Sequence, residues 1–312
     1  MGEAKGRGRV ANSRLLSSSV ITSRIMGRKR IAAVAILSTL LMLHDLKKKG
    51  VAWLDGDGEE NTTFSSSELV NKTVWKSTAR SCEARPVHLE RGWYKSQSGE
   101  DRSLQKWFKD ICNGTYLEIG GLNGVRYSNS YMYNKGLNWT GVLVEASPRN
   151  YQQLVVNRPN EIANVHAGVC EKEMDLHWVE ARPGVGGFQE FAAPEFQKQW
   201  WSQSHIQNAK VVKCRTLEHI LLNITNAGPR FYFDFFSLDV EGAELSVLRS
   251  VNFDTTAFGV IFVEADGHNE TKDKEVRVYL ESNGYTYYEE KSRSLWFLNN
   301  DFWAIYEGLI HS

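Results

Sequence analysis

The chain has 312 residues, a formal net charge of zero and 42% hydrophobic residues, enough for one large globular domain or two small ones. Residues 1–30 contain eight Lys or Arg and one acid, so the rest of the chain has seven more acidic than basic residues. Because this larger part of the chain carries a net negative charge, it lacks the basic surface typical of nucleic-acid-binding proteins. We therefore expect no nucleic-acid partner.

An uncharged apolar stretch, residues 31–43, follows the basic segment. It is apolar on every side, unlike an amphipathic core helix, although it is short for a membrane span of about 17–25 residues. We predict a basic cytosolic tail (1–30), a signal-anchor transmembrane segment (31–46) and a stem or linker (47–100). The excess of basic residues before the apolar stretch favours a single-pass type II protein of the Golgi or ER, with a lumenal body. A cleaved signal peptide or an organelle transit peptide, which would give a soluble organellar protein, is the alternative.

Four cysteines and six N-x-S/T sequons agree with a lumenal body. The sequons begin at Asn61, Asn71, Asn113, Asn138, Asn223 and Asn269. The cysteines fit no metal-binding spacing, and disulfides form in oxidising compartments. We predict a Cys82–Cys112 bridge that clamps the stem to the domain, and a Cys170–Cys214 bridge within the sheet layer. Four buried free thiols are the alternative.

Residues 101–312 alternate strand-like and helix-like segments. The expected strands are 115–119, 141–145, 162–169, 210–213, 231–238 and 258–263, with a closing pair at 285–289 and 294–298. The expected helices are 104–111, 126–138, 147–157, one that begins after Thr216, one that ends at Arg249, and 273–282. This alternation predicts a single α/β domain with a mostly parallel seven-stranded sheet and helices on both faces. Residues 174–191 are expected to form two short antiparallel strands around the glycine-rich loop 182–187, which is either a cover over a ligand or a plain hairpin loop.

Glycines and acids follow the first two predicted strands, in the pattern Glu118-x-Gly120-x-x-x-Gly124 and then Glu145. The carboxyl ends of parallel strands share one edge of the sheet, where ligands bind. Glycine allows a positive φ and a close approach of ligand to backbone, and an acid that ends the second strand can accept hydrogen bonds from ribose hydroxyls. We predict Glu118, Gly120, Gly124 and Glu145 to bind a cofactor. A plain strand–helix turn is the alternative.

Further polar residues follow the two later central strands. Asp239 and Glu241 come after the strand 231–238, and Glu264 and His268 come after the strand 258–263. In a parallel sheet these side chains would meet at the same edge as Glu145. We predict Asp239, Glu241, Glu264 and His268 to be catalytic. For Asp239 a first-turn helix acid, and for His268 an exposed loop position, are the alternatives.

The chain resembles the FkbM-like family of class I S-adenosylmethionine (SAM)-dependent methyltransferases. The matching stretches are 116–124, 139–145 with Pro148, 214–217, 236–244 and 263–264, and the block Ser-Leu-Asp-Val-Glu-Gly-Ala-Glu (237–244) is the most specific. The resemblance implies a Rossmann-like class I methyltransferase fold, SAM as cofactor, and methyl transfer to a hydroxyl, commonly of a sugar or polyketide. Gly121 departs from the pattern, which often has Ala or Ser there.

The expected function is a SAM-dependent O-methyltransferase that acts on a glycan, another lumenal carbohydrate or a related small molecule. The hydroxyl must lose its proton, and His268 is one candidate base because an unperturbed imidazole has a pKa of about 6.5. Alternatively, Asp239, Glu241 and Glu264 could hold a divalent cation that acidifies the hydroxyl. The sequence leaves these two open. A non-catalytic, membrane-tethered interaction or trafficking protein with the same fold is the alternative function.

Overall fold

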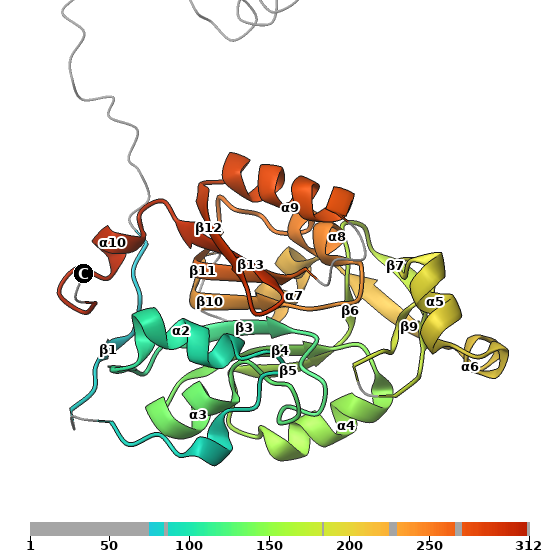
Figure 1. The fold of residues 1–312 in the computed structure, drawn as a ribbon, viewed down its shortest axis with the longest axis horizontal. Coiled ribbons are helices and arrows are strands. Elements are labelled where there is room, and N and C mark those ends of the chain that lie inside the picture. The colour runs from blue at the N-terminus through green and yellow to red at the C-terminus, as the bar shows by residue number, and fades with distance from the viewer. Residues whose placement is uncertain (1–74, 84–86, 183, 225–229, 266–269, 311–312) are drawn as a thin grey trace, which may run out of the picture. The chain divides into compact units, whose positions relative to one another are not determined.

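The computed structural model describes residues 75–83, 87–182, 184–224, 230–265 and 270–310 (Figure 1). Its centre is a seven-stranded sheet in the order β12, β13, β11, β10, β3, β4, β5. These strands are β3 (Thr115–Ile119), β4 (Thr140–Glu145), β5 (Ala163–His166), β10 (Phe231–Leu238), β11 (Thr256–Glu264), β12 (Tyr285–Lys291) and β13 (Ser294–Asn299). The strands from β11 to β5 pair in parallel, whereas β13 pairs antiparallel with both β11 and β12. The predicted mostly parallel seven-stranded sheet is confirmed.

The central strand β10 is buried over nearly its whole length, because its side chains face an apolar core on both sides of the sheet. Neighbouring residues point to opposite faces, as expected for a strand. The ring of Phe235 lies 5.5 Å from that of Tyr116 in one core, and the ring of Phe236 lies 4.7 Å from that of Phe258 in the other. The stretch 231–238, which is mostly apolar apart from Asp234 and Ser237, is therefore correctly predicted as a strand covered on both faces.

Helices cover both faces of this sheet (Figure 1). On one face lie α7 (Leu217–Ile224), α8 (Glu244–Arg249) and α9 (Glu270–Ser282). On the other lie α2 (Glu100–Phe108), α3 (Tyr131–Leu137), α4 (Pro148–Asn157) and α10 (Phe302–Ile305), with the short 3-10 helix η1 (Arg91–Trp93) nearby. The predicted cap of α4 is present, because the Ser147 hydroxyl accepts a hydrogen bond from the Asn150 amide at 3.1 Å. Thr216 caps α7 in the same way, through the amide of His219 at 3.2 Å.

A second, four-stranded sheet lies in the chain between β5 and α7, in the order β6, β9, β7, β8. It consists of β6 (Gly168–Val169), β7 (Met174–Val179), β8 (Gly187–Phe188) and β9 (Lys210–Arg215), with α5 (Pro194–Trp200) and α6 (Gln203–Gln207) inserted before β9. The expected single strand 162–169 is thus two strands in two sheets. The strand at 210–213 also belongs to the second sheet rather than the main one. Its pairing with β6 and β7, rather than with β5, explains the difference.

Both predicted disulfides are present. Cys82 is bonded to Cys112 and Cys170 to Cys214, and the second bridge joins the residue directly after β6 to β9 of the small sheet. The expected stem, residues 47–100, contributes its last part to the fold. The strand β1 (Arg80–Ser81) pairs with β2 (Ile111–Cys112), and the Ser77 hydroxyl donates a hydrogen bond to the buried Asp234 carboxylate.

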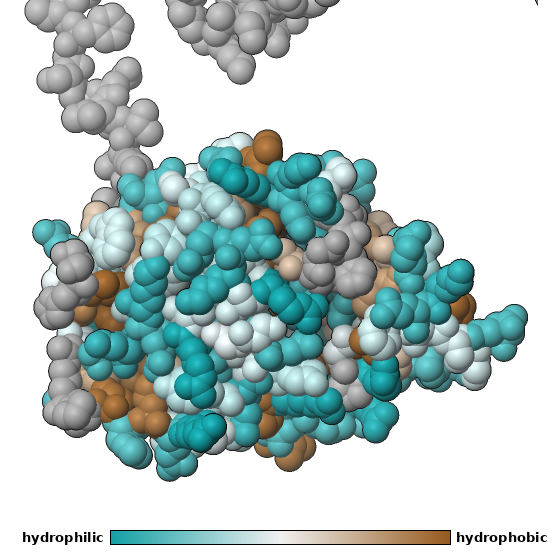
Figure 2. Space-filling model, in the orientation of Figure 1, coloured by the Kyte–Doolittle hydropathy of each residue, from teal (hydrophilic) through white to brown (hydrophobic). Residues whose placement is uncertain are grey.

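No helix in the described part of the chain is long and apolar enough to cross a membrane. The expected anchor, residues 31–46, and the sequons at Asn61, Asn71 and Asn269 lie outside the described residues. The face of the folded part seen in Figure 2 is mainly hydrophilic, with hydrophobic colour confined to small separate areas.

Candidate active site

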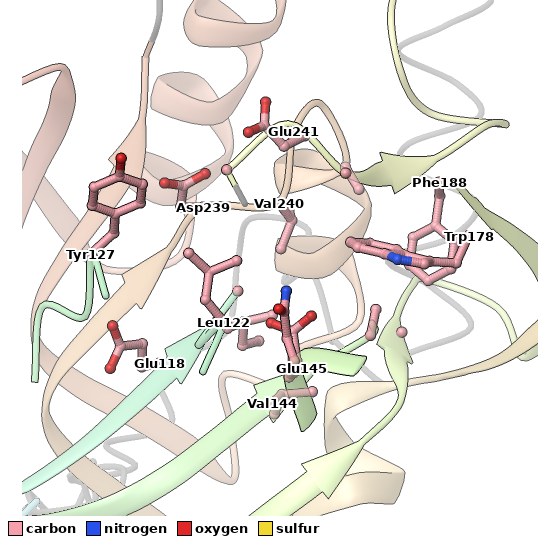
Figure 3. A pocket seen from close by; sticks show the side chains of 18 of the residues that line it. Glu118, Leu122, Tyr127, Val144, Glu145, Trp178, Phe188, Asp239, Val240 and Glu241 are labelled. Carbon is pink, nitrogen blue, oxygen red and sulfur yellow. The ribbon is translucent and has the colours of Figure 1, made fainter. Parts of the chain in front are cut away.

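A cavity lies where the carboxyl ends of β3, β4 and β10 meet (Figure 3). The chain runs from β3 to β4 and β5 on one side, and β10 and β11 lie on the other, so this is the point where the strand order reverses. Open α/β sheets bind their ligands at such a point. The cavity encloses about 940 Å³ of empty space, including the part open to solvent. Of the predicted residues, Glu118, Gly120, Glu145, Asp239 and Glu241 line it.

Both carboxylate oxygens of Glu118 accept hydrogen bonds from residues 128–130. One carboxylate oxygen accepts a hydrogen bond from the Asn129 amide at 2.7 Å, and the other accepts from the hydroxyls of Ser128 at 3.0 Å and Ser130 at 2.5 Å. Burial raises the pKa of Glu118, while Arg158 and these three donors oppose the rise. Its carboxylate thus shapes the loop that borders the cavity. Holding this loop also explains why α3 begins at Tyr131 instead of the expected position 126.

The two predicted glycines differ in position. Gly120 lines the cavity and has a φ of +90°, next to the backbone of Asp239. Gly124 also has a positive φ, of +76°, but it does not line the cavity. A β-carbon at Gly124 would lie 2.6 Å from Cγ of Arg158, so this glycine makes room for the arginine. Its predicted contact with a cofactor stays a prediction.

Sequence reasoning missed Arg158 and Glu161, which form a buried ion pair with an Nε–Oε1 distance of 2.8 Å. Arg158 also donates to the Gly124 carbonyl at 2.9 Å and to the Ser130 hydroxyl at 3.0 Å. Because Ser130 in turn donates to Glu118, the network links the end of α4 to the floor of the cavity. No short motif marks such a pair, since its partners are brought together only by the fold.

Glu145 ends β4 and is 2% exposed. One of its oxygens accepts a hydrogen bond from the Ser147 amide at 2.7 Å. Burial raises the pKa of Glu145 to about 8, and the nearby Glu180 contributes to the rise, whereas the backbone donors oppose it. A buried carboxyl of this kind gains from hydroxyl donors that stabilise its ionised form. The position therefore fits the predicted contact with a ribose.

The carboxylates of Asp239, Glu241 and Glu264 gather at the mouth of the cavity, each with an oxygen within 4.8 Å of the others. Asp239 and Glu264 share a hydrogen bond, and burial together with the neighbouring acids raises the pKa of Glu264 well above its usual range. One carboxylate of this cluster can take up a proton, or the oxygens of all three can bind a hard divalent cation. The structure thus brings together three of the four predicted catalytic residues. The fourth, His268, lies outside the described residues.

The small sheet supplies one wall of the cavity. The expected antiparallel pair within 174–191 is present as β7 and β8, and Arg182, Gly184 and Gly186 of the glycine-rich loop between them line the cavity. The rings of Trp178 on β7 and Phe188 on β8 meet edge to face at 5.2 Å (Figure 3). The indole N–H of Trp178 donates to Glu180 at 3.3 Å. Taken together, the cavity has five acidic lining residues and one basic residue, Arg182; the acids are Glu118, Glu145, Glu180, Asp239 and Glu241. This balance suits a ligand with a positive charge.

A family model described as the methyltransferase FkbM domain matches residues 118–287, more than half of the chain. The chain belongs to this family. The match spans the strand ends that form the cavity, and it confirms the resemblance to SAM-dependent methyltransferases. A search of curated proteins found no match.

A search of solved structures matched an FkbM methyltransferase from Methylobacillus flagellatus, with 14% sequence identity and a TM-score of 0.36. That match covers 60% of this chain but only 43% of the Methylobacillus chain. Another is a precorrin-6y C5,15-methyltransferase from Geobacter metallireducens, with 12% identity, a TM-score of 0.34, and coverage of 68% of this chain and 92% of that one. A SAM-dependent methyltransferase from Aquifex aeolicus matches at 11% identity and a TM-score of 0.29, over 64% of this chain and 92% of that one.

SAM, the cofactor that the family implies, fits the residues present. Its sulfonium is positively charged, and the lining is predominantly acidic. At Gly120 the backbone itself lines the cavity, because there is no side chain, and the buried carboxyl of Glu145 also lines it. Trp178 and Phe188 offer aromatic faces against which a planar base can pack.

Proposed function

We propose that this protein is a SAM-dependent O-methyltransferase that acts on a hydroxyl of a glycan or related carbohydrate. The observation that carries the proposal is the acidic cavity at the switch point of the sheet, with three carboxylates gathered at its mouth. Membership of the FkbM methyltransferase domain family supports the cofactor, and the carboxylate group supports a hydroxyl acceptor, because a hydroxyl has to give up a proton.

SAM, when bound, supplies a methyl group that is activated for transfer. Glu145 would accept hydrogen bonds from the ribose, and the acidic lining would balance the sulfonium charge. Asp239 and Glu241 lie where the acceptor hydroxyl would approach, and one of these carboxylates, or Glu264, takes its proton. The methyl group would pass from the sulfonium of SAM to the acceptor oxygen that these carboxylates deprotonate. Alignment of the two reactants contributes up to about 7–11 kcal/mol to such a reaction.

The same three carboxylates fit a divalent cation, which would acidify the hydroxyl instead. The two routes differ in one measurable way. Removal of divalent cations with a chelator should leave methyl transfer unchanged if a carboxylate is the base, and should abolish it if a cation is required. The predicted role of His268 as base stays a third route, tested by His268→Gln.

The proposed function is tested first by SAM binding to the full chain in a calorimeter. We expect a single site, followed by transfer of tritium from methyl-labelled SAM to a carbohydrate hydroxyl. No heat at millimolar SAM would contradict the proposal and favour the non-catalytic interaction or trafficking role. An unrelated methyl acceptor, such as a thiol or amine, as the better substrate would overturn the O-methyltransferase assignment alone.

We also propose that residues 31–46 anchor the protein in the Golgi or ER membrane, with the folded part in the lumen. Two disulfides support an oxidising compartment, and three sequons, at Asn113, Asn138 and Asn223, fall within the fold. Protease added to intact vesicles should remove only residues 1–30, and an N-glycosidase should lower the mass of the protected part. Cleavage of the folded part from the cytosolic side would contradict this topology.

A further inference from the structure

A second cavity adjoins the cofactor cavity at the mouth where the carboxylates gather. It encloses about 1050 Å³ of empty space, including the part open to solvent. The two cavities share five lining residues, which are Gln97, Tyr127, Arg182, Gly184 and Glu241. We call this second cavity the outer cleft. An acceptor that enters from solvent on this side passes through the outer cleft before it reaches the transferred methyl group.

The charge of the outer cleft differs from that of the cofactor cavity. Three arginines line it, Arg126, Arg182 and Arg293, against two acids, Glu241 and Glu264. The cofactor cavity has the opposite balance, with five acids and one arginine. Because an arginine side chain stays charged at any physiological pH, the outer cleft carries a lasting positive excess.

Two of these arginines have guanidinium groups that no carboxylate engages among the described residues, although Nη2 of Arg126 donates a hydrogen bond to the Tyr127 hydroxyl at 3.0 Å. The guanidinium of Arg126 lies 4.7 Å from the ring centre of Tyr127, and that of Arg182 lies 4.9 Å from the ring centre of Trp200. Among the described residues neither forms an ion pair with a carboxylate, and both side chains are exposed. Arg293 is different, because it approaches Glu264 at 3.4 Å.

Stacking of a guanidinium on an aromatic ring leaves the N–H groups at its edge free to point sideways. A stacked arginine can therefore donate two parallel hydrogen bonds to a carboxylate or to the oxygens of a sulfate. Trp200 and Tyr127 also present flat rings to the cleft, and Phe196 extends this apolar surface. Sugar rings can pack against such aromatic surfaces.

We propose that the outer cleft binds the acceptor, and that this acceptor is an acidic sugar with a carboxylate or sulfate close to the methylated hydroxyl. This inference deepens the proposed function and rests on it. Arg126 and Arg182 hold the anionic group, Trp200 holds the ring, and the hydroxyl is directed toward Glu241, which both cavities share. A neutral sugar would leave the two stacked arginines without an anionic partner.

The backbone at the junction of the cavities supports this arrangement. Tyr127 has a φ of +60° and Glu241 a φ of +56°, although neither is a glycine. Such a conformation costs about 1–3 kcal/mol per residue and is concentrated at functional sites. Two strained residues lie on the boundary between the cofactor cavity and the outer cleft, where the hydroxyl and the methyl group would meet.

The test uses the full chain with SAM binding and acceptor binding measured separately. The probes are a chondroitin tetrasaccharide, which carries uronate groups, its carboxyl-reduced neutral form, and a sulfated version of the carboxyl-reduced form, which carries sulfate as its only anion. We expect the uronate or the sulfated probe to bind at least about tenfold more tightly than the neutral form and to accept the methyl group. The arm that binds more tightly identifies the anion as carboxylate or sulfate.

Arg126→Gln and Arg182→Gln should each weaken binding of the acidic probe about tenfold and leave binding of the neutral form unchanged. Arg277→Gln is the matched control, because Arg277 is also exposed and stacked on a ring, 4.1 Å from that of Tyr287, but lies on α9 outside both cavities. Its affinity for the acidic probe should match that of the wild type.

The outcomes separate the inference from the proposed function. If SAM binds but the charged and neutral probes bind equally, or neither binds, the acidic-acceptor inference is overturned and the methyltransferase assignment stands. Tighter binding of a phosphoserine peptide than of either acidic sugar would also overturn it. If SAM does not bind at all, the proposed function fails, and the inference fails with it.

Discussion

A β-carbon on residue 120 would lie 1.9 Å from the backbone carbonyl oxygen of Asp239, so only glycine fits against that residue. The end of β3 and the end of β10 are in direct backbone contact here, and the Asp239 amide donates to the Ile119 carbonyl at 3.2 Å. Gly120 needs its positive φ as well as this space. The position of Asp239 at the mouth of the cavity therefore depends on the absence of a side chain at Gly120, at the end of the neighbouring strand.

Gly120→Ala should lower the free energy of unfolding strongly and abolish SAM binding. Gly284→Ala is the matched control, because Gly284 also has a φ of +90° but has nothing within 4 Å of the added β-carbon. The control should lose about 1–2 kcal/mol from the backbone conformation alone. Urea unfolding and calorimetry of both variants measure the difference. Equal losses would mean that the contact with Asp239 relaxes without cost.

Glu145→Ala should weaken SAM binding by about 1–3 kcal/mol, the loss of charge-assisted hydrogen bonds to the ribose hydroxyls. The exposed Glu275 on α9 provides a control, and Glu275→Ala should bind SAM like the wild type. Titration calorimetry gives both affinities. An unchanged affinity in Glu145→Ala would show that the ribose lies elsewhere in the cavity.

The pKa of Glu145, raised to about 8, predicts a pH dependence of binding and of stability. Ribose donors favour the ionised carboxylate, so SAM binding at pH 7 should release a proton and should strengthen as the pH rises toward 8. In the absence of SAM, the pH dependence of folding stability has the opposite sign. The raised pKa means that the native state holds a proton that the unfolded state has lost, so this contribution to stability is present below about pH 4.5 and is lost as the pH rises to about 8.

Calorimetry of SAM binding in two buffers with different ionisation enthalpies measures the released proton. Glu145→Gln cannot release it, so its binding heat should not depend on the buffer in this way. A wild type whose binding heat is independent of the buffer would show that Glu145 does not lose a proton when SAM binds.

Much of this fold could be predicted from the sequence, because its strands are long or strongly apolar. The run 231–238 became β10 with the same bounds, and the motif that ends in Glu145 correctly marked the second parallel strand. The small sheet was harder, since β6 and β8 have two residues each and carry no periodicity of their own. As a result, the aromatic wall formed by Trp178 and Phe188 was not foreseen.

The candidate site was predicted in location more accurately than in detail. A motif shows which residues follow a strand, but not which partners will occupy their hydrogen bonds. Glu118 illustrates this, because three donors from residues 128–130 engage its carboxylate inside the protein. Arg158 and Glu161 show the reverse, a buried pair that determines the shape of the loop yet matches no pattern in the sequence.

Arg158→Met should lower the free energy of unfolding by about 3–5 kcal/mol, because it leaves Glu161 buried without its counter-charge. The double variant Arg158→Met with Glu161→Gln removes both charges and should recover part of that loss. Urea unfolding measures the three free energies. A double variant less stable than Arg158→Met would mean that Glu161 is supported mainly by its other donors, the hydroxyl of Tyr116, the side-chain amide of Asn134 and the backbone amide of Gly141.

The Cys170–Cys214 bridge should affect SAM binding as well as stability. It joins the residue directly after β6 to β9, in the same apolar cluster as Phe188, and a β-carbon on Gly168 of β6 would lie 2.6 Å from the Phe188 ring. Loss of this bridge therefore loosens the aromatic wall of the cofactor cavity. Because the bridge closes a loop of 44 residues, its removal should cost about 4 kcal/mol in the chain-entropy model.

The Cys82–Cys112 bridge is the matched control, since it closes a similar loop of 30 residues but joins β1 to β2, away from the residues that line the cavity. Replacing both cysteines of either bridge by serine should lower the free energy of unfolding, and by slightly less for the Cys82–Cys112 pair, because loop entropy grows with loop length. Only the variant without Cys170–Cys214 should also bind SAM more weakly at a temperature where both variants are fully folded. Equal SAM affinity in the two variants would show that the small sheet keeps its position without the bridge.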